Sequence, residues 1–174
     1  MATVIDALLD RQREILEYLR DKGEISHALE FENNFKKLFV MACGSFFEAE
    51  LLTYLETFAR QNADPKLSAL VVNKALKRQY FTMFDWDEGR NVNKFCALFG
   101  SDFKDEVVAE IKGSDAHTRS MKDFLALGAQ RNVLAHANLA AFAVEKTLDE
   151  LREMYASGLQ FLRFVQSKFP LAVS

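Results

Sequence analysis

The chain has 174 residues, a length that fits a single domain over residues 1–174 with its own hydrophobic core. Hydrophobic residues make up 49% and charged residues 27%, the composition of an ordinary soluble globular protein, and sixteen phenylalanines predict an aromatic-rich core. The net charge of −3 excludes a basic field over the whole surface, so any contact with nucleic acid requires a local basic patch.

The N-terminal part of the chain predicts two helices. Apolar residues recur at three- and four-residue steps over residues 4–19, and Asp-Lys-Gly at 21–23 closes that amphipathic helix. Ser26 is the expected N-cap of a second helix, whose apolar pattern continues unbroken to Asn62.

The middle of the chain predicts short helices. Pro65 follows Asp64 at a position where a helix tolerates proline, so a short helix is expected to begin there. Residues 81–93 indicate an aromatic-rich connection, and another short helix is expected over residues 93–99, ended by Gly100.

The C-terminal part predicts three further helices. Ser101 is expected to cap a helix to Lys112, Ser114 one to about Asn138, and a last helix covers about residues 144–168. No strand-like alternation, internal repeat or flexible linker occurs in the sequence. We therefore expect an all-α fold, a bundle built around two or three long helices with shorter helices in the connection.

Neither a metal nor a cofactor is expected. Cys43 and Cys96 lack metal-ligand spacing and predict buried free thiols in a reducing compartment. Residues 85–93, DWDEGRNVN, are superficially similar to a calcium loop, but Arg90 replaces its glycine and Cys96 its final glutamate. The sequence has no HExxH helix, phosphate-binding glycine loop or GxSxG motif.

A cytoplasmic protein without a membrane span is expected. The N-terminal sequence lacks the apolar core of a signal peptide. No apolar run comes near the roughly 18 residues that a membrane-spanning helix needs.

A small basic cluster lies before the aromatic-rich connection. Lys74, Lys77 and Arg78 follow one another at helical spacing, with Tyr80 and Phe81 after them. These three side chains form either a solvated helix face or a patch that binds RNA phosphates, and the sequence leaves both interpretations open.

The segment GAQRNVLAHANLAA, residues 128–141, has polar residues in a helix whose pattern otherwise indicates burial. On a helical wheel, Asn132, His136 and Asn138 lie about 100°, 140° and −20° from Arg131. Gly128 and Ala135 fall between Arg131 and His136 and form a small-residue floor. Such a floor permits close approach by a second helix or by a substrate.

A purely structural interpretation of these polar residues needs no ligand. Arg131 can pair with a core carboxylate, for which Glu48 and Glu50 are the candidates. His136 and Asn132, one turn apart, can satisfy each other's hydrogen bonds. Because a buried polar group without a partner is costly, the segment faces either such partners or a cleft.

The run RNVLAH at 131–136 resembles the R-x4-6-H motif of HEPN domains, in the form with a polar residue after the arginine. The stretches GSFFEAEL at 44–51 and FDWDEGRNVNKFCALFG at 84–100 resemble segments of stand-alone prokaryotic HEPN proteins. The motif also falls in a late helix of an all-α chain, with one more long helix after it. The resemblance thus covers most of the chain.

This resemblance implies an HEPN-type endoribonuclease. It implies a homodimer that pairs the 124–140 helices and cleaves RNA without a metal, at a site composed of both chains. The ribose 2′-OH would attack the neighbouring phosphate. His136 would transfer protons, as histidine does near neutral pH, and Arg131 would stabilise charge on the phosphoryl oxygens.

Asn132 is expected to be the third catalytic residue and would orient His136 or the phosphate. Glu48 and Asn138 are expected to support the site, and Glu48, with Glu50 as the alternative, would position the arginine or the histidine. Asn138 stands where the subgroup controlled by nucleotidyltransferase antitoxins typically has a tyrosine, so the resemblance to that subgroup is incomplete.

The resemblance also implies a biological setting, in prokaryotic defence or toxin–antitoxin systems, with an antitoxin or regulatory protein as partner. The alternative function is a non-catalytic HEPN-type module for dimerisation or RNA binding.

Overall fold

The structure is a computed structural model that describes residues 2–77, 79–86, 91–136 and 138–172. Its helices are α1 (Val4–Asp21), α2 (Ile25–Asn62), α3 (Pro65–Val71), the π-helix η1 (Val72–Leu76), α4 (Tyr80–Met83), α5 (Asn93–Ala97), α6 (Ser101–Lys112), α7 (Asp115–His136) and α8 (Leu148–Ser167). No strand occurs among these described ranges, which confirms the all-α prediction.

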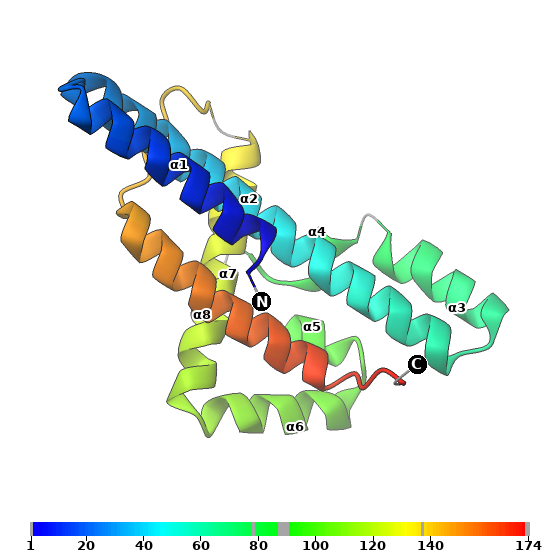
Figure 1. Cartoon of the computed structure of the whole chain (residues 1–174). Coiled ribbons are helices and arrows are strands. Elements are labelled where there is room, and N and C mark those ends of the chain that lie inside the picture. Colours follow the sequence, from blue (N-terminus) through cyan, green and yellow to red (C-terminus); the bar gives the residue numbers. More distant parts are fainter. Residues whose placement is uncertain (1, 78, 87–90, 137, 173–174) are drawn as a thin grey trace.

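Helix α2 organises the molecule (Figure 1). Its 38 residues span about 57 Å, and its two ends pack against different partners. Helix α1 lies along the N-terminal half of α2 and α3 along the C-terminal half, because the turns that join them are short. Helices α7 and α8 pack against each other and against α2, and α6 packs against α5 and α7.

Two of the predicted N-caps are wrong. The second helix already begins at Ile25, so Ser26 lies inside its first turn, and Ser101 is itself the first residue of α6. In both places a glycine with positive φ turns the chain just before the helix: Gly23 at 75° and Gly100 at 103°. The geometry of the turn, rather than a serine cap, therefore determines where these helices begin.

The ends of α7 and α8 differ from expectation in part. Ser114 Oγ accepts a hydrogen bond from the His117 N–H at 3.2 Å, in agreement with the predicted cap of α7. Helix α7 ends at His136, however, and not at Asn138. Helix α8 begins only at Leu148, because Thr147 and the glutamate three residues later form a reciprocal capping box.

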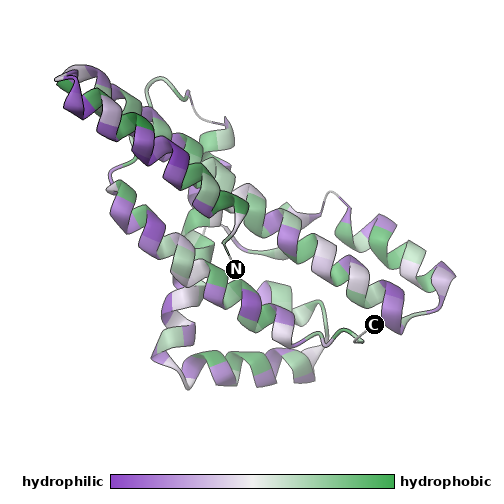
Figure 2. Ribbon diagram, in the orientation of Figure 1, coloured by the Kyte–Doolittle hydropathy of each residue, from purple (hydrophilic) through white to green (hydrophobic). Residues whose placement is uncertain are grey.

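The core is rich in aromatic residues, as the composition predicts. The phenylalanines that are less than 2% exposed are Phe39, Phe47, Phe95, Phe124 and Phe161. Phe47 stacks on Tyr155 of α8, with ring centres 5.7 Å apart. The Tyr155 hydroxyl lies 2.7 Å from Thr3 Oγ1, which links α8 to the start of α1. Figure 2 shows hydrophobic and hydrophilic residues alternating along the long helices, as expected for helices with one face in a core.

Helix α2 is also long and apolar enough, by length and composition alone, to cross a membrane. The core helix of a soluble protein meets the same criteria. Nine of its residues are buried, and it packs against α1, α7 and α8 within the chain. Its apolar character is accounted for by its central place in the bundle.

Candidate functional site

The C-terminal end of α7 carries the residues of the motif. Arg131 and Asn132 are half-buried, and Leu134 is buried in the core. Ala135 and His136, the last two helical residues, are exposed. The last turn of α7 thus leaves the core, in contrast to the buried helix that the apolar pattern of this segment predicted.

Arg131 is held by an ion pair across the bundle. Its Nη2 donates to Glu48 Oε2 of α2 at 2.9 Å, and the two side chains are only 16% and 25% exposed. Glu50 is exposed and makes no such contact, so Glu48 is the carboxylate that faces α7. Asn132 Oδ1 accepts a weaker hydrogen bond from Arg131 Nη1 at 3.3 Å.

A glycine on α2 makes room for this pair. A Cβ atom at Gly44 would lie 2.7 Å from Cβ of Arg131 and 2.8 Å from its Cγ, closer than real Cβ atoms approach. Gly44 lies one turn before Glu48, on the same face of α2. The segment at 44–51 therefore supplies both the space for the arginine and its carboxylate partner.

Two aromatic residues of α4 complete the surroundings of Arg131. The guanidinium carbon lies 4.6 Å from the ring centre of Phe81, in cation–π geometry. Tyr80 is buried, and burial is the main cause that raises the pKa of its hydroxyl. The negative charge of Glu48 raises the same pKa and the charge of Arg131 lowers it, so Tyr80 lies within electrostatic reach of the ion pair. In the sequence, Tyr80 and Phe81 stand out only as neighbours of the basic cluster.

The small-residue floor is partly covered by the chain itself. A Cβ atom at Gly128 would overlap the ring of Trp86, so the indole packs directly on the glycine. The expectation that a second helix or a substrate approaches there is therefore wrong for Gly128. Only Ala135, at the other end of the floor, is exposed.

Asn132 and His136 do not satisfy each other. Both residues are described, and no hydrogen bond joins them; the Asn132 amide oxygen accepts from Arg131 instead. The exposed ring of His136 stands at the end of α7, about 140° around the helix axis from Arg131. Within one chain, Arg131 and His136 therefore face different sides of α7.

Asn138 lies beyond the helix, in the connection to α8. Its side-chain oxygen accepts a hydrogen bond from the Ala140 N–H at 3.1 Å, and its carbonyl accepts from the Ala141 and Phe142 N–H groups. Lys37 of α2 donates to the Leu139 carbonyl at 2.7 Å. The structure thus gives Asn138 a role in shaping this turn and does not bring it to Arg131.

The basic cluster is only partly described. Lys74 and Lys77 are exposed on and just after η1, and Lys77 Nζ donates to Asn73 Oδ1 at 3.1 Å. Arg78 lies outside the described residues. Both lysines precede α4, the helix that carries Phe81 against Arg131.

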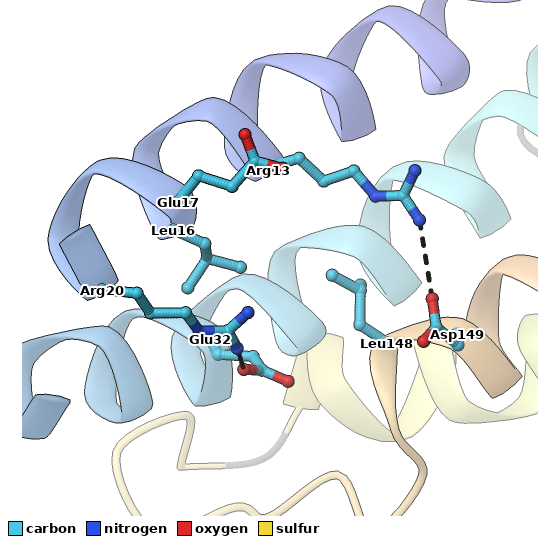
Figure 3. A pocket seen from close by; sticks show the side chains of 7 residues that line it. All are labelled: Arg13, Leu16, Glu17, Arg20, Glu32, Leu148 and Asp149. Atoms are coloured by element: carbon cyan, nitrogen blue, oxygen red, sulfur yellow. Dashed lines mark hydrogen bonds and ion pairs between the residues drawn. The ribbon is translucent and has the colours of Figure 1, made fainter.

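A pocket lies between α1, α2 and the start of α8 (Figure 3). Its arginines are paired within the chain: Arg13 lies 3.6 Å from Asp149, and Arg20 lies 2.9 Å from Glu32. It contains none of the motif residues, so it is not the better candidate.

Metal ligands do not cluster in the described part of the chain. No group of three or more histidine, cysteine, aspartate or glutamate side chains lies together there. Within the stretch that is similar to a calcium loop, Asp85 pairs with Lys94 at 3.0 Å, and residues 87–90 lie outside the described ranges.

Comparison with known proteins agrees with the resemblance of the motif. Searches of curated proteins and of solved structures found no match. A family model described as RiboL-PSP-HEPN matches residues 6–169, nearly the whole chain, including both α2 with Glu48 and α7 with Arg131 and His136. The chain therefore belongs to the RiboL-PSP-HEPN family.

Proposed function

We propose that this protein is an endoribonuclease that cleaves RNA without a metal, with Arg131 and His136 as its catalytic residues. The observation that carries the proposal is the fixed guanidinium of Arg131, held by Glu48 near the end of a helix whose last residue is an exposed histidine. Membership of an HEPN family supports a nuclease-like or RNA-related role.

The two side chains suit cleavage by the ribose 2′-OH. The 2′ oxygen bonds to the adjacent phosphorus while the bond from phosphorus to the 5′ oxygen breaks, leaving a 2′,3′-cyclic phosphate and a 5′-OH. His136 accepts the proton of the 2′-OH or donates one to the leaving oxygen. Arg131 stabilises the charge that develops on the phosphoryl oxygens.

The site is proposed to form between two copies of the chain. Because Arg131 and His136 point about 140° apart around α7, a second α7 crossing the first would bring the arginine of one chain to the histidine of the other. Three exposed apolar residues support such an interface: Val133, Leu139 and Leu38, which are 53%, 51% and 52% exposed. A dimer that covers them would remove apolar surface from water.

We also propose the setting that the family resemblance implies. The protein would act in the cytoplasm, in a prokaryotic defence or toxin–antitoxin system, under the control of an antitoxin or another regulatory protein.

The test of cleavage compares wild type with His136→Ala on RNA in the presence of EDTA. Wild type should cleave, with cyclic phosphate and 5′-OH ends, and the variant should not. His27→Ala is the matched control, since His27 is likewise exposed on a helix but pairs with Glu24. Intact RNA with wild type, or equal cleavage by both enzymes, would contradict the proposal.

The composite site has its own test. Arg131→Ala and His136→Ala are each expected to be inactive, but an equimolar mixture should recover roughly a quarter of wild-type activity, because half of the dimers are mixed and each has one complete pair. No recovery in a mixture that demonstrably exchanges subunits, or a strict monomer in light scattering, would rule out the composite site.

A non-catalytic module for RNA binding or dimerisation is the second candidate function. The contacts of Arg131 with Glu48, Asn132 and Phe81 favour it, because an arginine held on three sides also suits a structural role. Wild type that binds RNA in EDTA and leaves it intact would identify this function.

A further inference from the structure

We infer that Phe81 is a stacking platform for a nucleobase beside Arg131, and that the site therefore takes single-stranded RNA. This inference rests on the proposed function for its choice of RNA as ligand. It concerns how the RNA is held, and not how it is cut.

The first observation is the state of the Phe81 ring. Phe81 is 42% exposed although it lies against the candidate site, and the Arg131 guanidinium lies over its ring, 4.6 Å from the ring centre. Nucleobases stack on aromatic rings and on guanidinium planes alike, so the pair offers two adjacent surfaces of the kind that bind unpaired bases.

The second observation is that the platform is fixed in place. Trp86 Nε1 donates to the Phe81 carbonyl at 3.1 Å, and the same indole packs on Gly128 of α7. The neighbouring Tyr80 is buried among Phe84 and Trp86. Phe81 is thus an exposed ring on a backbone that is tied to the motif helix, and a rigid ring loses little conformational entropy when a base stacks on it.

The third observation is that two exposed lysines lie close to Phe81 in the sequence. Lys77 is exposed and stands four residues before Phe81 in the chain, and Lys74, three residues before Lys77, is exposed as well. A basic track combined with an aromatic ring is the usual way in which proteins hold a single strand without reading its sequence. Bases in a duplex are already stacked and paired, so a platform of this kind selects unpaired RNA.

Binding is measured in the His136→Ala background, so that the probe stays intact. The probe is a fluorescent single-stranded RNA 12-mer, and its Kd is read by anisotropy. Phe81→Leu should raise the Kd about 5- to 150-fold, whereas Phe81→Trp should keep it within about two-fold. Tyr18→Leu is the matched control, because Tyr18 is also an exposed aromatic residue in cation–π contact, with Lys22.

A second probe separates stacking from mere positioning of Arg131. An abasic ribose-phosphate oligomer of the same length should bind Phe81→Leu and its parent equally. If Phe81→Leu weakened binding of the abasic probe as much as binding of the 12-mer, the stacking inference would be overturned. Unchanged binding of the 12-mer to Phe81→Leu would overturn it as well. This assay measures binding and not cleavage. A wild type that fails to cut RNA would therefore refute the proposed enzyme only. Stacking on Phe81 would still be supported if the effect of Phe81→Leu depends on the bases.

Discussion

Replacing Glu48 by glutamine tests the central contact of the site. The substitution keeps the size of the side chain and removes its charge, so that Arg131 loses its carboxylate partner while the backbone of α2 is unchanged. We expect Glu48→Gln to destabilise the fold and to lower RNA cleavage.

The magnitude follows from the burial of the pair. Both side chains are mostly buried, at 16% and 25% exposed, so solvent screens them less than a surface pair. Breaking a fully buried pair costs about 3–5 kcal/mol, and Arg131 retains Asn132 and Phe81 as partners. We therefore expect a loss of about 1–3 kcal/mol, which lowers the Tm of a chain of this size by roughly 2–12 °C.

The assay is thermal unfolding followed by circular dichroism, with Glu50→Gln as the matched control. Glu50 lies two residues along the same helix, is exposed, and should change the Tm by about 1 °C or less. Equal Tm values for the two variants would show that the ion pair contributes nothing to stability. A double-mutant cycle with Arg131→Met should return a favourable coupling energy between Glu48 and Arg131.

Three further substitutions or treatments probe the packing around the site and the core. Gly44→Ala should lower both Tm and RNA cleavage, because its Cβ would lie 2.7 Å from the Cβ of Arg131. A variant with unchanged Tm and unchanged cleavage would contradict this. Gly128→Ala should cost about 1–3 kcal/mol in urea unfolding, since the new methyl group overlaps Trp86; an unchanged midpoint would refute the contact. Burial raises the pKa of Cys96 to about 11, so its thiol should react with Ellman's reagent near pH 8 only after unfolding. The same shift makes the folded form less stable as pH rises from the ordinary thiol pKa of about 8.5 through about 11, and fast labelling of the native protein would disprove the burial.

Most of the fold could be predicted because the apolar periodicity and the residues that start and end helices agree in this chain. Unbroken 3.6-residue patterns and few glycines and prolines define α2 as far as Asn62, and Pro65 and Asp64 locate the next start. The errors concern helix ends. Ser26 and Ser101 satisfy the residue preference of an N-cap, but the positive-φ glycines before them already direct the chain into the helix.

The candidate site was less predictable because it depends on how helices face each other. Glu48 and Glu50 are about 200° apart on α2, so only one can face α7, and a motif on α7 alone cannot choose between them. The choice was nevertheless present in the α2 pattern, since Glu48 follows Gly44 by one turn, beside the buried Phe47 and Leu51. No comparable local signal brings Phe81 to Arg131, because that contact joins a four-residue helix to a residue fifty positions later.

The two catalytic candidates differ in how far one chain prepares them. Arg131 is already oriented by Glu48 on α2 and Phe81 on α4, so it can stabilise charge without reorganising during the reaction. His136 stands exposed on the last turn of α7, where the chain leaves the core. Its orientation must come from whatever covers that turn. Under the proposed function, the covering surface is a second copy of the chain, so cleavage should follow the concentration of dimer and not that of total protein. Dilution below the dimer dissociation constant would then inactivate the enzyme without unfolding it. A regulator that binds the end of α7 would inactivate it in the same way.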